Sequence, residues 1–164
     1  MDGVEDFSQF LTDEELMKVA PMLERLNKLD EREEKQKDFM SFVKYVWPDF
    51  IEGAHHKIYA EKLQAVADGK IKRLIINMPP RHTKSEFASY LFPTWLMGRD
   101  PTKKIIQATH TAELAVGFGR KVKNLIENED FQDIFPDVKL AVDAKASGRW
   151  STNAGGEYYA VGVG

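Results

Sequence analysis

The residues best suited to chemistry form one short polar run, PPRHTKS, from Pro79 to Ser85. The apolar stretch at residues 71–80 predicts a strand, and the apolar spacing in residues 85–100 predicts an amphipathic helix. A strand, a tight loop and then Lys-Ser at the start of a helix is the arrangement that binds nucleotide phosphates. In such a loop, backbone N–H groups and the positive end of the helix dipole converge on the phosphates.

The residues of this run have distinct expected roles. Lys84 reaches the outer phosphates as a point charge, and the Ser85 hydroxyl binds Mg²⁺. The guanidinium of Arg81 is suited to stabilising the charge of a γ-phosphate. Pro79 and Pro80 lack an N–H group but hold the backbone extended. Five backbone N–H donors remain, those of Arg81, His82, Thr83, Lys84 and Ser85.

The run departs from the glycine-rich pattern G-x-x-x-x-G-K-S/T at both glycines, since Met78 and Thr83 stand in their places. A β-branched residue fits poorly at positive φ, so a working loop requires ordinary helical or bridging angles at Thr83. The alternative is a plain strand-to-helix connection in which Ser85 or Thr83 caps the helix. The pattern alone leaves both interpretations open.

Other elements must position this run. Helical periodicity is present in residues 13–37, 39–47, 55–70, 85–100 and 111–130. A second strand is predicted at residues 103–110, and a hairpin at residues 148–164 with its turn at Asn153 to Gly156. Strand, helix, strand, helix with short connections predicts an α/β fold, a parallel sheet covered by helices. Side chains expected to face the core include Ile58, Leu63, Phe87, Leu91, Trp95 and Leu114.

The composition excludes several classes of protein. The 164-residue chain has 23 Lys and Arg, 26 Asp and Glu and no Cys, so it cannot form a disulfide scaffold or a cysteine-ligated zinc site. No apolar run approaches the ~20 residues of a membrane-spanning helix, and the acidic N-terminus lacks the features of a secretion signal. We therefore expect a soluble, intracellular protein. Its charge is uneven, because residues 1–38 carry 12 acids and 6 bases.

Taken together, residues 40–164 resemble the ATPase domain of the large terminase subunit of tailed bacteriophages. The resemblance includes PDFIEGAHHKIYAEKL, RLIINMPPRHTKSE, QATHTAELAVGFGR and GRWSTNAGGEYYAVGVG. In that family the phosphate loop, or Walker A loop, often begins with PPR and ends with Lys-Ser. The resemblance implies an ASCE/RecA-like P-loop NTPase fold. It also implies an ATP-driven motor that moves double-stranded DNA into a procapsid.

Residue by residue, the resemblance implies that Lys84 and Ser85 contact the phosphates and Mg²⁺ and that Arg81 is catalytic, acting on the γ-phosphate. It places the region of His55 and His56 near the adenine, although a capping or surface role for these histidines is the alternative. The residues implied to bind ATP are Pro80, Arg81, His82, Thr83, Lys84, Ser85, His55 and His56, with Ser85 also the Mg²⁺ ligand.

The change in charge and composition near residue 39 sets apart an acidic helical arm, residues 1–38, and the resemblance implies that residues 39–164 are the N-terminal portion of a P-loop ATPase domain. No counterpart of the family's Walker B strand, coupling motif or nuclease carboxylates is recognisable, since the acidic candidates Glu113 and Asp143 lie outside a strand-end context. We therefore expect an incomplete sheet and no hydrolysis by these 164 residues alone. The arm is either a solvated helix packed on the body or a docking arm for a protein partner.

The implied partners are double-stranded DNA, the portal protein, the small terminase subunit and further copies of this chain in a ring. The implied location is the host cytoplasm, with transient docking on the procapsid. Two other functions remain open. One is a helicase-like nucleic-acid translocase, and the other is a non-catalytic assembly module whose loop binds no nucleotide. Basic residues available to DNA are Lys103, Lys104, Arg120, Lys121 and Lys123.

Overall fold

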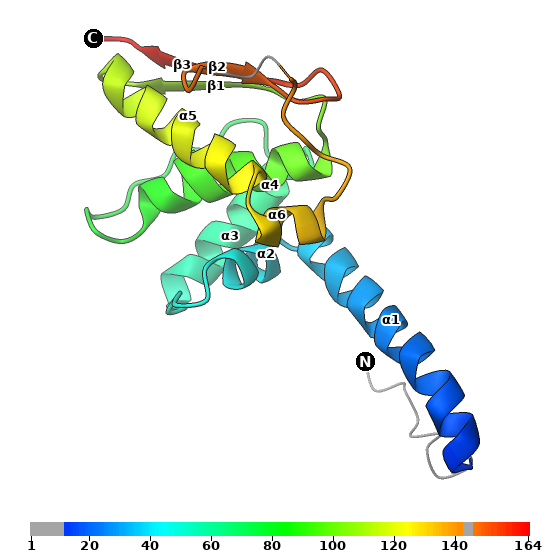
Figure 1. Ribbon diagram of the computed structural model, residues 1–164. Helices are drawn as coiled ribbons and strands as arrows, with labels where there is room; N and C mark the ends of the chain where they lie inside the picture. Colours follow the sequence, from blue (N-terminus) through cyan, green and yellow to red (C-terminus); the bar gives the residue numbers. More distant parts are fainter. Residues whose placement is uncertain (1–11, 143–145) are drawn as a thin grey trace. The chain divides into compact units, whose positions relative to one another are not determined.

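A computed structural model describes residues 12–142 and 146–164 of the chain (Figure 1). The chain divides into two compact units, Met1–Glu33 and Glu34–Gly164, and each is described by itself. In the described ranges, no helix combines the length and the apolar character needed to cross a membrane.

Most of helix α1 (Asp13–Lys37) belongs to the first unit, and it is the single helix that the sequence predicts. A reciprocal capping arrangement starts it, because the Thr12 N–H donates to Glu15 Oε2 (2.9 Å) and the Glu15 N–H donates to Thr12 Oγ1 (3.4 Å). Pro21 lies inside the helix. Several apolar side chains of α1 are exposed, among them Met17, Met22, Leu23, Leu26 and Leu29.

The second unit contains a three-stranded sheet in the order β1-β3-β2. Strand β1 (Lys104–Thr109) runs parallel to β3 (Glu157–Gly162), and the short β2 (Arg149–Ser151) pairs antiparallel with β3. The predicted second strand and the predicted hairpin are therefore confirmed. The hairpin turns where Gly155 adopts a φ of 86°, a conformation that glycine adopts without strain.

The helices that follow α1 lie on one side of this sheet, and α5 packs directly against it (Figure 1). They are α2 (Phe39–Val46), α3 (Ala54–Ala67), the π-helix η2 (Glu86–Leu91), α4 (Phe92–Arg99), α5 (Ala112–Ile126) and α6 (Glu129–Ile134). The predicted inward positions Leu63, Phe87, Leu91 and Trp95 are buried. The predicted α/β class is thus confirmed for a small mixed sheet with flanking helices.

Two of the predicted inward positions are wrong. Ile58 is 61% exposed and Leu114 is 51% exposed. In α3 the buried stripe runs instead through His56, Tyr59 and Leu63, spaced i, i+3 and i+7. Ile58 lies off this stripe, so the most hydrophobic residue of the helix faces solvent while a histidine and a tyrosine face inward.

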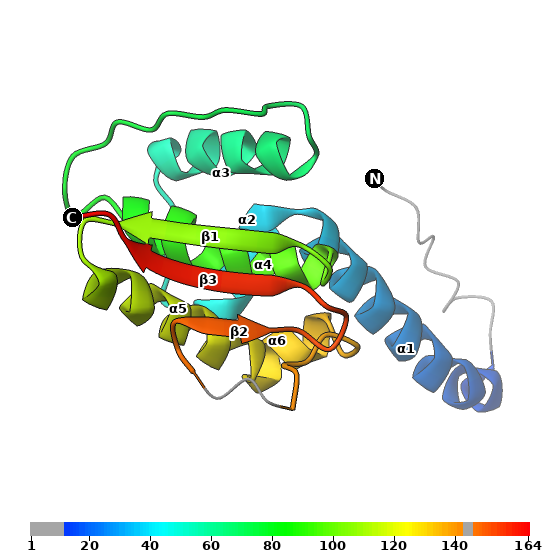
Figure 2. The same cartoon turned by 90° about the horizontal axis from the view of Figure 1, so that it is seen from above.

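The predicted strand at residues 71–80 is also wrong. The segment runs extended beyond α3 without pairing (Figure 2). Its side chains alternate as in a strand, since Leu74, Ile76 and Met78 pack against the core while Ile75 is 88% exposed. Within the described ranges, however, no neighbouring strand exchanges backbone hydrogen bonds with residues 72–78. The side chains do alternate between buried and exposed, but in the described ranges the segment lacks the backbone hydrogen bonds to a neighbour that define a β-strand.

Two glycines of α5 provide a test of how tightly this helix packs. A Cβ added at Gly119 would lie 2.5 Å from the Ser147 carbonyl oxygen and 3.0 Å from Tyr158 Cε1, whereas at Gly117 it would meet no described atom within 4 Å. We predict that Gly119→Ala lowers the free energy of unfolding by about 1–3 kcal/mol through overpacking. Gly117→Ala should raise it by about 0.5–1 kcal/mol, because alanine favours helix. Urea denaturation of both variants measures the difference, and equal effects would contradict the packing.

Candidate functional site

The polar run forms a loop between the extended segment and η2. Its residues line a pocket of about 330 Å³. A second pocket of about 340 Å³ has Pro79 and Lys84 in common with the first, and it adds Asn77 and Met78. The lining of the first pocket consists of Pro79, Pro80, Arg81, Thr83, Lys84, Ser85 and Glu86. Of the predicted loop residues, only His82 is missing from this lining.

The backbone of the loop leaves its N–H groups available. Helical structure begins at Lys84, and the Phe87 N–H donates to the Thr83 carbonyl (3.0 Å). By contrast, none of the backbone N–H groups of residues 81–85 donates to an acceptor in the part of the chain that the structure describes. The five donors counted from the sequence are therefore unpaired at the start of a helix, where N–H groups favour an anion.

The charged side chains of the loop lie at this pocket. Lys84 is half-buried, and its Nζ donates to the Met78 carbonyl oxygen at 3.3 Å. Arg81 and Ser85 are exposed, so both can reach a ligand. His82 is also exposed, and its Nδ1 lies 2.9 Å from the Pro80 carbonyl oxygen. The lining of this pocket therefore includes two basic side chains and a hydroxyl.

The ordinary helical or bridging angles that the sequence analysis required of Thr83 in a working loop are not found. Thr83 has a φ of 57° and Arg81 a φ of 64°, both in the left-handed region that residues with a Cβ rarely adopt. At Thr83 the structure supplies a reason. Its Oγ1 donates to the His82 carbonyl (2.6 Å) and lies 2.7 Å from His56 Nε2. These hydrogen bonds offset the strain that the sequence argument identified.

Helix α3 holds the loop through two side chains one turn apart. His56 contacts Thr83, and three residues later the Tyr59 hydroxyl donates to the Lys84 carbonyl oxygen (2.9 Å). Burial raises the pKa of Tyr59 to about 12, so the hydroxyl keeps its proton and remains a donor. Sequence analysis missed Tyr59. Its i+3 spacing from His56 puts the two on one helix face, which is a signal that the sequence contains.

His56 is 5% exposed and both of its ring nitrogens contact the protein. Its ring packs against Phe50 (centroids 4.8 Å apart) and Phe87 (5.4 Å). Burial lowers the pKa of His56 below its usual range, and the neighbouring His55 lowers it further. The ring is therefore held neutral, in a position that supports the loop. His55 is exposed, and its ring centroid lies 5.7 Å from that of His82.

Glu86 is a second residue that sequence analysis missed. It lines the pocket and its carboxylate accepts a hydrogen bond from Lys121 Nζ (2.8 Å), which ties the start of η2 to α5. As for metals, the described ranges contain no group of three or more His, Cys, Asp or Glu side chains arranged to hold an ion. Glu113 is exposed in the first turn of α5, and Asp143 lies outside the described residues.

Comparisons of the chain with protein-family models, with curated proteins and with solved structures found no match.

The Tyr59 hydrogen bond gives a prediction with a matched control. Tyr59→Phe removes a donor to the backbone of Lys84 and should lower the free energy of unfolding by about 1 kcal/mol. The hydroxyl of Tyr158 is also buried but has no hydrogen-bond partner among the described residues. Tyr158→Phe should therefore be neutral or slightly stabilising. Thermal or urea unfolding compares the two, and a loss at Tyr158 as large as that at Tyr59 would refute the assignment.

The lowered pKa of His56 predicts a pH dependence. The unfolded chain takes up a proton at an ordinary histidine pKa of about 6.5, whereas the folded protein resists it. Stability due to neutral His56 is therefore complete above that pH and is lost as the pH falls through it. Between about pH 7.5 and pH 5.5 the wild type should lose more stability than His56→Phe, which has no proton to gain. Parallel pH profiles of unfolding would disprove this.

Proposed function

We propose that residues 79–86 bind the phosphates of a nucleotide, ATP together with Mg²⁺. The observation that carries this proposal is the row of unpaired backbone N–H groups at residues 81–85, at the start of a helix. Phosphate is recognised by this combination of clustered N–H donors and a helix N-terminus. The strand-like approach of residues 72–78 and the Lys-Ser pair at the helix start support the same conclusion.

The side chains complete the site. Lys84 lies in the lining of both pockets, so a short movement away from the Met78 carbonyl lets its ammonium contact the outer phosphates. The Ser85 hydroxyl is the Mg²⁺ ligand, and Arg81 stabilises charge on the γ-phosphate. The pockets, about 330 and 340 Å³, are each in the size range of sites for small molecules.

The wider proposal is that this chain is the ATP-binding part of a terminase large subunit, with a P-loop NTPase fold. The resemblance in residues 40–164 supports it, together with the loop geometry. In this proposal the complete protein is an ATPase that translocates double-stranded DNA into a procapsid in the host cytoplasm. Its partners are the portal protein, the small terminase subunit and other copies of itself in a ring. Hydrolysis requires a further group that orients the attacking water, so the proposed activity of these 164 residues is nucleotide binding.

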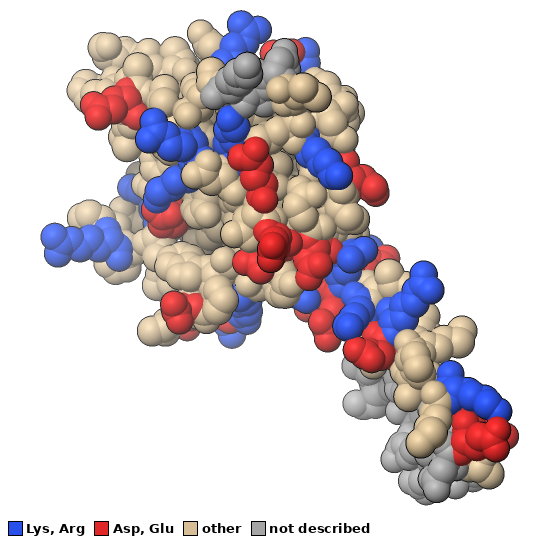
Figure 3. Space-filling view, in the orientation of Figure 1, with Lys and Arg blue, Asp and Glu red and all other residues tan. Residues whose placement is uncertain are grey.

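DNA binding has little electrostatic support in the second unit. Lys103 pairs with Asp100 (3.1 Å), Lys104 with Glu157 (3.4 Å) and Lys121 with Glu86 (2.8 Å). Figure 3 shows basic and acidic side chains interspersed on the face in view, without a stripe of one sign. The proposal that this protein contacts DNA therefore rests on the resemblance to the terminase family and not on the charges of the second unit.

A second candidate is the non-catalytic assembly module. The exposed apolar side chains of α1, such as Leu23, Leu26 and Leu29, are the observation that favours it, because such a stripe is suited to another helix. In this case the loop only connects two elements. An unchanged melting temperature on addition of ATP and Mg²⁺ would favour this candidate, since a ligand that binds the folded state raises it.

The proposal predicts that Lys84→Ala weakens ATP·Mg²⁺ binding about 100-fold, as expected for the loss of a charge-assisted contact of about 3 kcal/mol. Isothermal titration of the full chain measures the affinity. Lys62→Ala is the control, because Lys62 is an exposed lysine of α3 whose partner is Glu61. Equal affinities of the wild type and Lys84→Ala would rule out the proposed site.

A further inference from the structure

The starting point is a residue in an unfavourable conformation at the centre of the loop. Thr83 occupies the position where glycine stands in the usual phosphate-binding pattern, and it has a φ of 57°. Glycine adopts this conformation freely, whereas a β-branched side chain is strained there. Such strain persists only when the surrounding structure holds the residue in place. The protein must therefore stabilise at Thr83 a backbone conformation that glycine would adopt without strain.

A series of linked hydrogen bonds provides this stabilisation. The Gly53 N–H lies 2.9 Å from His56 Nδ1, which must accept because an N–H can only donate. A neutral imidazole that accepts at Nδ1 carries its proton on Nε2, so His56 donates to Thr83 Oγ1 (2.7 Å). Thr83 in turn donates to the His82 carbonyl (2.6 Å). Every link has a defined direction, and the series ends on the loop backbone.

The His56 ring is itself fixed in place. It occupies the third position of α3, and its Nδ1 accepts the N–H of the residue that caps this helix, Gly53. Phe50 and Phe87 contact the ring. The imidazole therefore has one orientation available, and that orientation directs Nε2 at Thr83.

We infer that His56 is a positioning residue that holds Thr83 in the left-handed conformation and so replaces the second glycine of the phosphate-binding pattern. This inference rests on the proposed nucleotide-binding function, which it deepens. His56 has no contact with the ligand in this account. It acts through Thr83, and it allows the N–H groups of residues 81–85 to remain unpaired.

The same series of hydrogen bonds makes the loop sensitive to protonation of His56. A doubly protonated ring carries a proton on Nδ1 and can no longer accept the Gly53 N–H, so the first link breaks. The titratable groups that act on the ring are His55 beside it on α3, His82 from the loop and Glu52 before α3. The two histidines disfavour its protonation and Glu52 favours it.

Four variants of the full chain test the inference by titration with ATP·Mg²⁺. His56→Phe keeps an aromatic ring between Phe50 and Phe87 but has no nitrogen, and Thr83→Val keeps the shape of threonine but has no hydroxyl. Each should weaken binding about tenfold, the effect of losing a hydrogen bond that holds a strained residue. Thr83→Gly should bind at least as well as the wild type. The double variant His56→Phe/Thr83→Gly should match Thr83→Gly, because glycine needs no support.

This rescue separates positioning from a general loss of stability. If His56→Phe merely loosened the fold, the loss of affinity would persist in the Thr83→Gly background. Persistent loss in the double variant would therefore overturn the inference. So would wild-type affinity of His56→Phe alone.

A readout without nucleotide distinguishes failure of the inference from failure of the proposed function. Positive φ brings the amide and α protons of one residue close together, so NMR of the free protein should show a strong cross-peak between them for Thr83. The cross-peak should weaken in His56→Phe and in Thr83→Val. If no variant binds ATP while the cross-peak behaves in this way, nucleotide binding is wrong and the positioning by His56 stands. An unchanged cross-peak in His56→Phe refutes the positioning whatever the affinities.

Discussion

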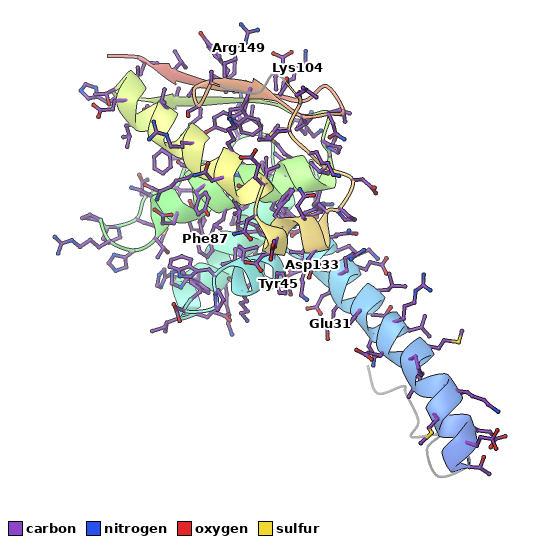
Figure 4. The ribbon with its side chains drawn as sticks, viewed as in Figure 1. Glu31, Tyr45, Phe87, Lys104, Asp133 and Arg149 are labelled. Atoms are coloured by element: carbon purple, nitrogen blue, oxygen red, sulfur yellow. The ribbon has the colours of Figure 1, made fainter. Side chains whose placement is uncertain are left out.

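The packing of aromatic rings around Phe87 is the interaction on which the candidate site depends. Phe87 is the first fully buried residue after the loop. Its ring packs against those of Phe39, Phe50, His56 and Tyr59, with centroids 5.4–5.7 Å apart. Phe87 is labelled in Figure 4. Rings from α2, α3 and the connection between them thus meet on the first residues of η2. Because interiors are close-packed, a shift of any of these rings would be transmitted to the loop.

This aromatic cluster supports the loop, because two of its members make hydrogen bonds to loop residues. A backbone segment with few internal hydrogen bonds normally needs water or a ligand to satisfy its polar groups. Here His56 and Tyr59, on one face of α3, belong to the aromatic cluster and also make hydrogen bonds to Thr83 and Lys84. The loop is therefore fixed at two points while the N–H groups of residues 81–85 stay without an acceptor in the described ranges. Structure of this kind is pre-organised, so less conformational entropy is lost when a ligand binds.

The sequence predicted the elements whose patterns are local. The helix at residues 13–37, the strand of β1 and the hairpin turn all follow from periodicity, caps and glycine. It failed where the outcome depends on distant residues. Residues 71–78 have the alternation of a strand, but pairing requires a neighbour that local pattern does not reveal. The preference for Ile58 over His56 as a core residue failed because His56 is buried through hydrogen bonds.

The candidate site likewise combines features that the local sequence predicts with features that depend on distant residues. The lining of the pocket by Arg81, Thr83, Lys84 and Ser85 could be read from the run PPRHTKS. The angles of Thr83 could not, because they depend on a side chain 27 positions earlier. Sequence reasoning identified the strain at Thr83 correctly and rejected a conformation that the folded protein stabilises. Threonine stands at position 83 in place of the glycine of the usual pattern, and His56 compensates for it. This pairing is visible only in the folded structure.

The extended segment before the loop has a consequence for how the protein behaves in concentrated solution. Residues 72–78 present backbone donors and acceptors without a ladder partner in the described ranges, next to the exposed side chain of Ile75. Such a row acts like the free edge of a sheet, to which another chain can add. Lys72 and Arg73 are exposed at the start of this apolar run. Their like charges repel a second copy aligned in parallel, so these two side chains act as gatekeepers against aggregation.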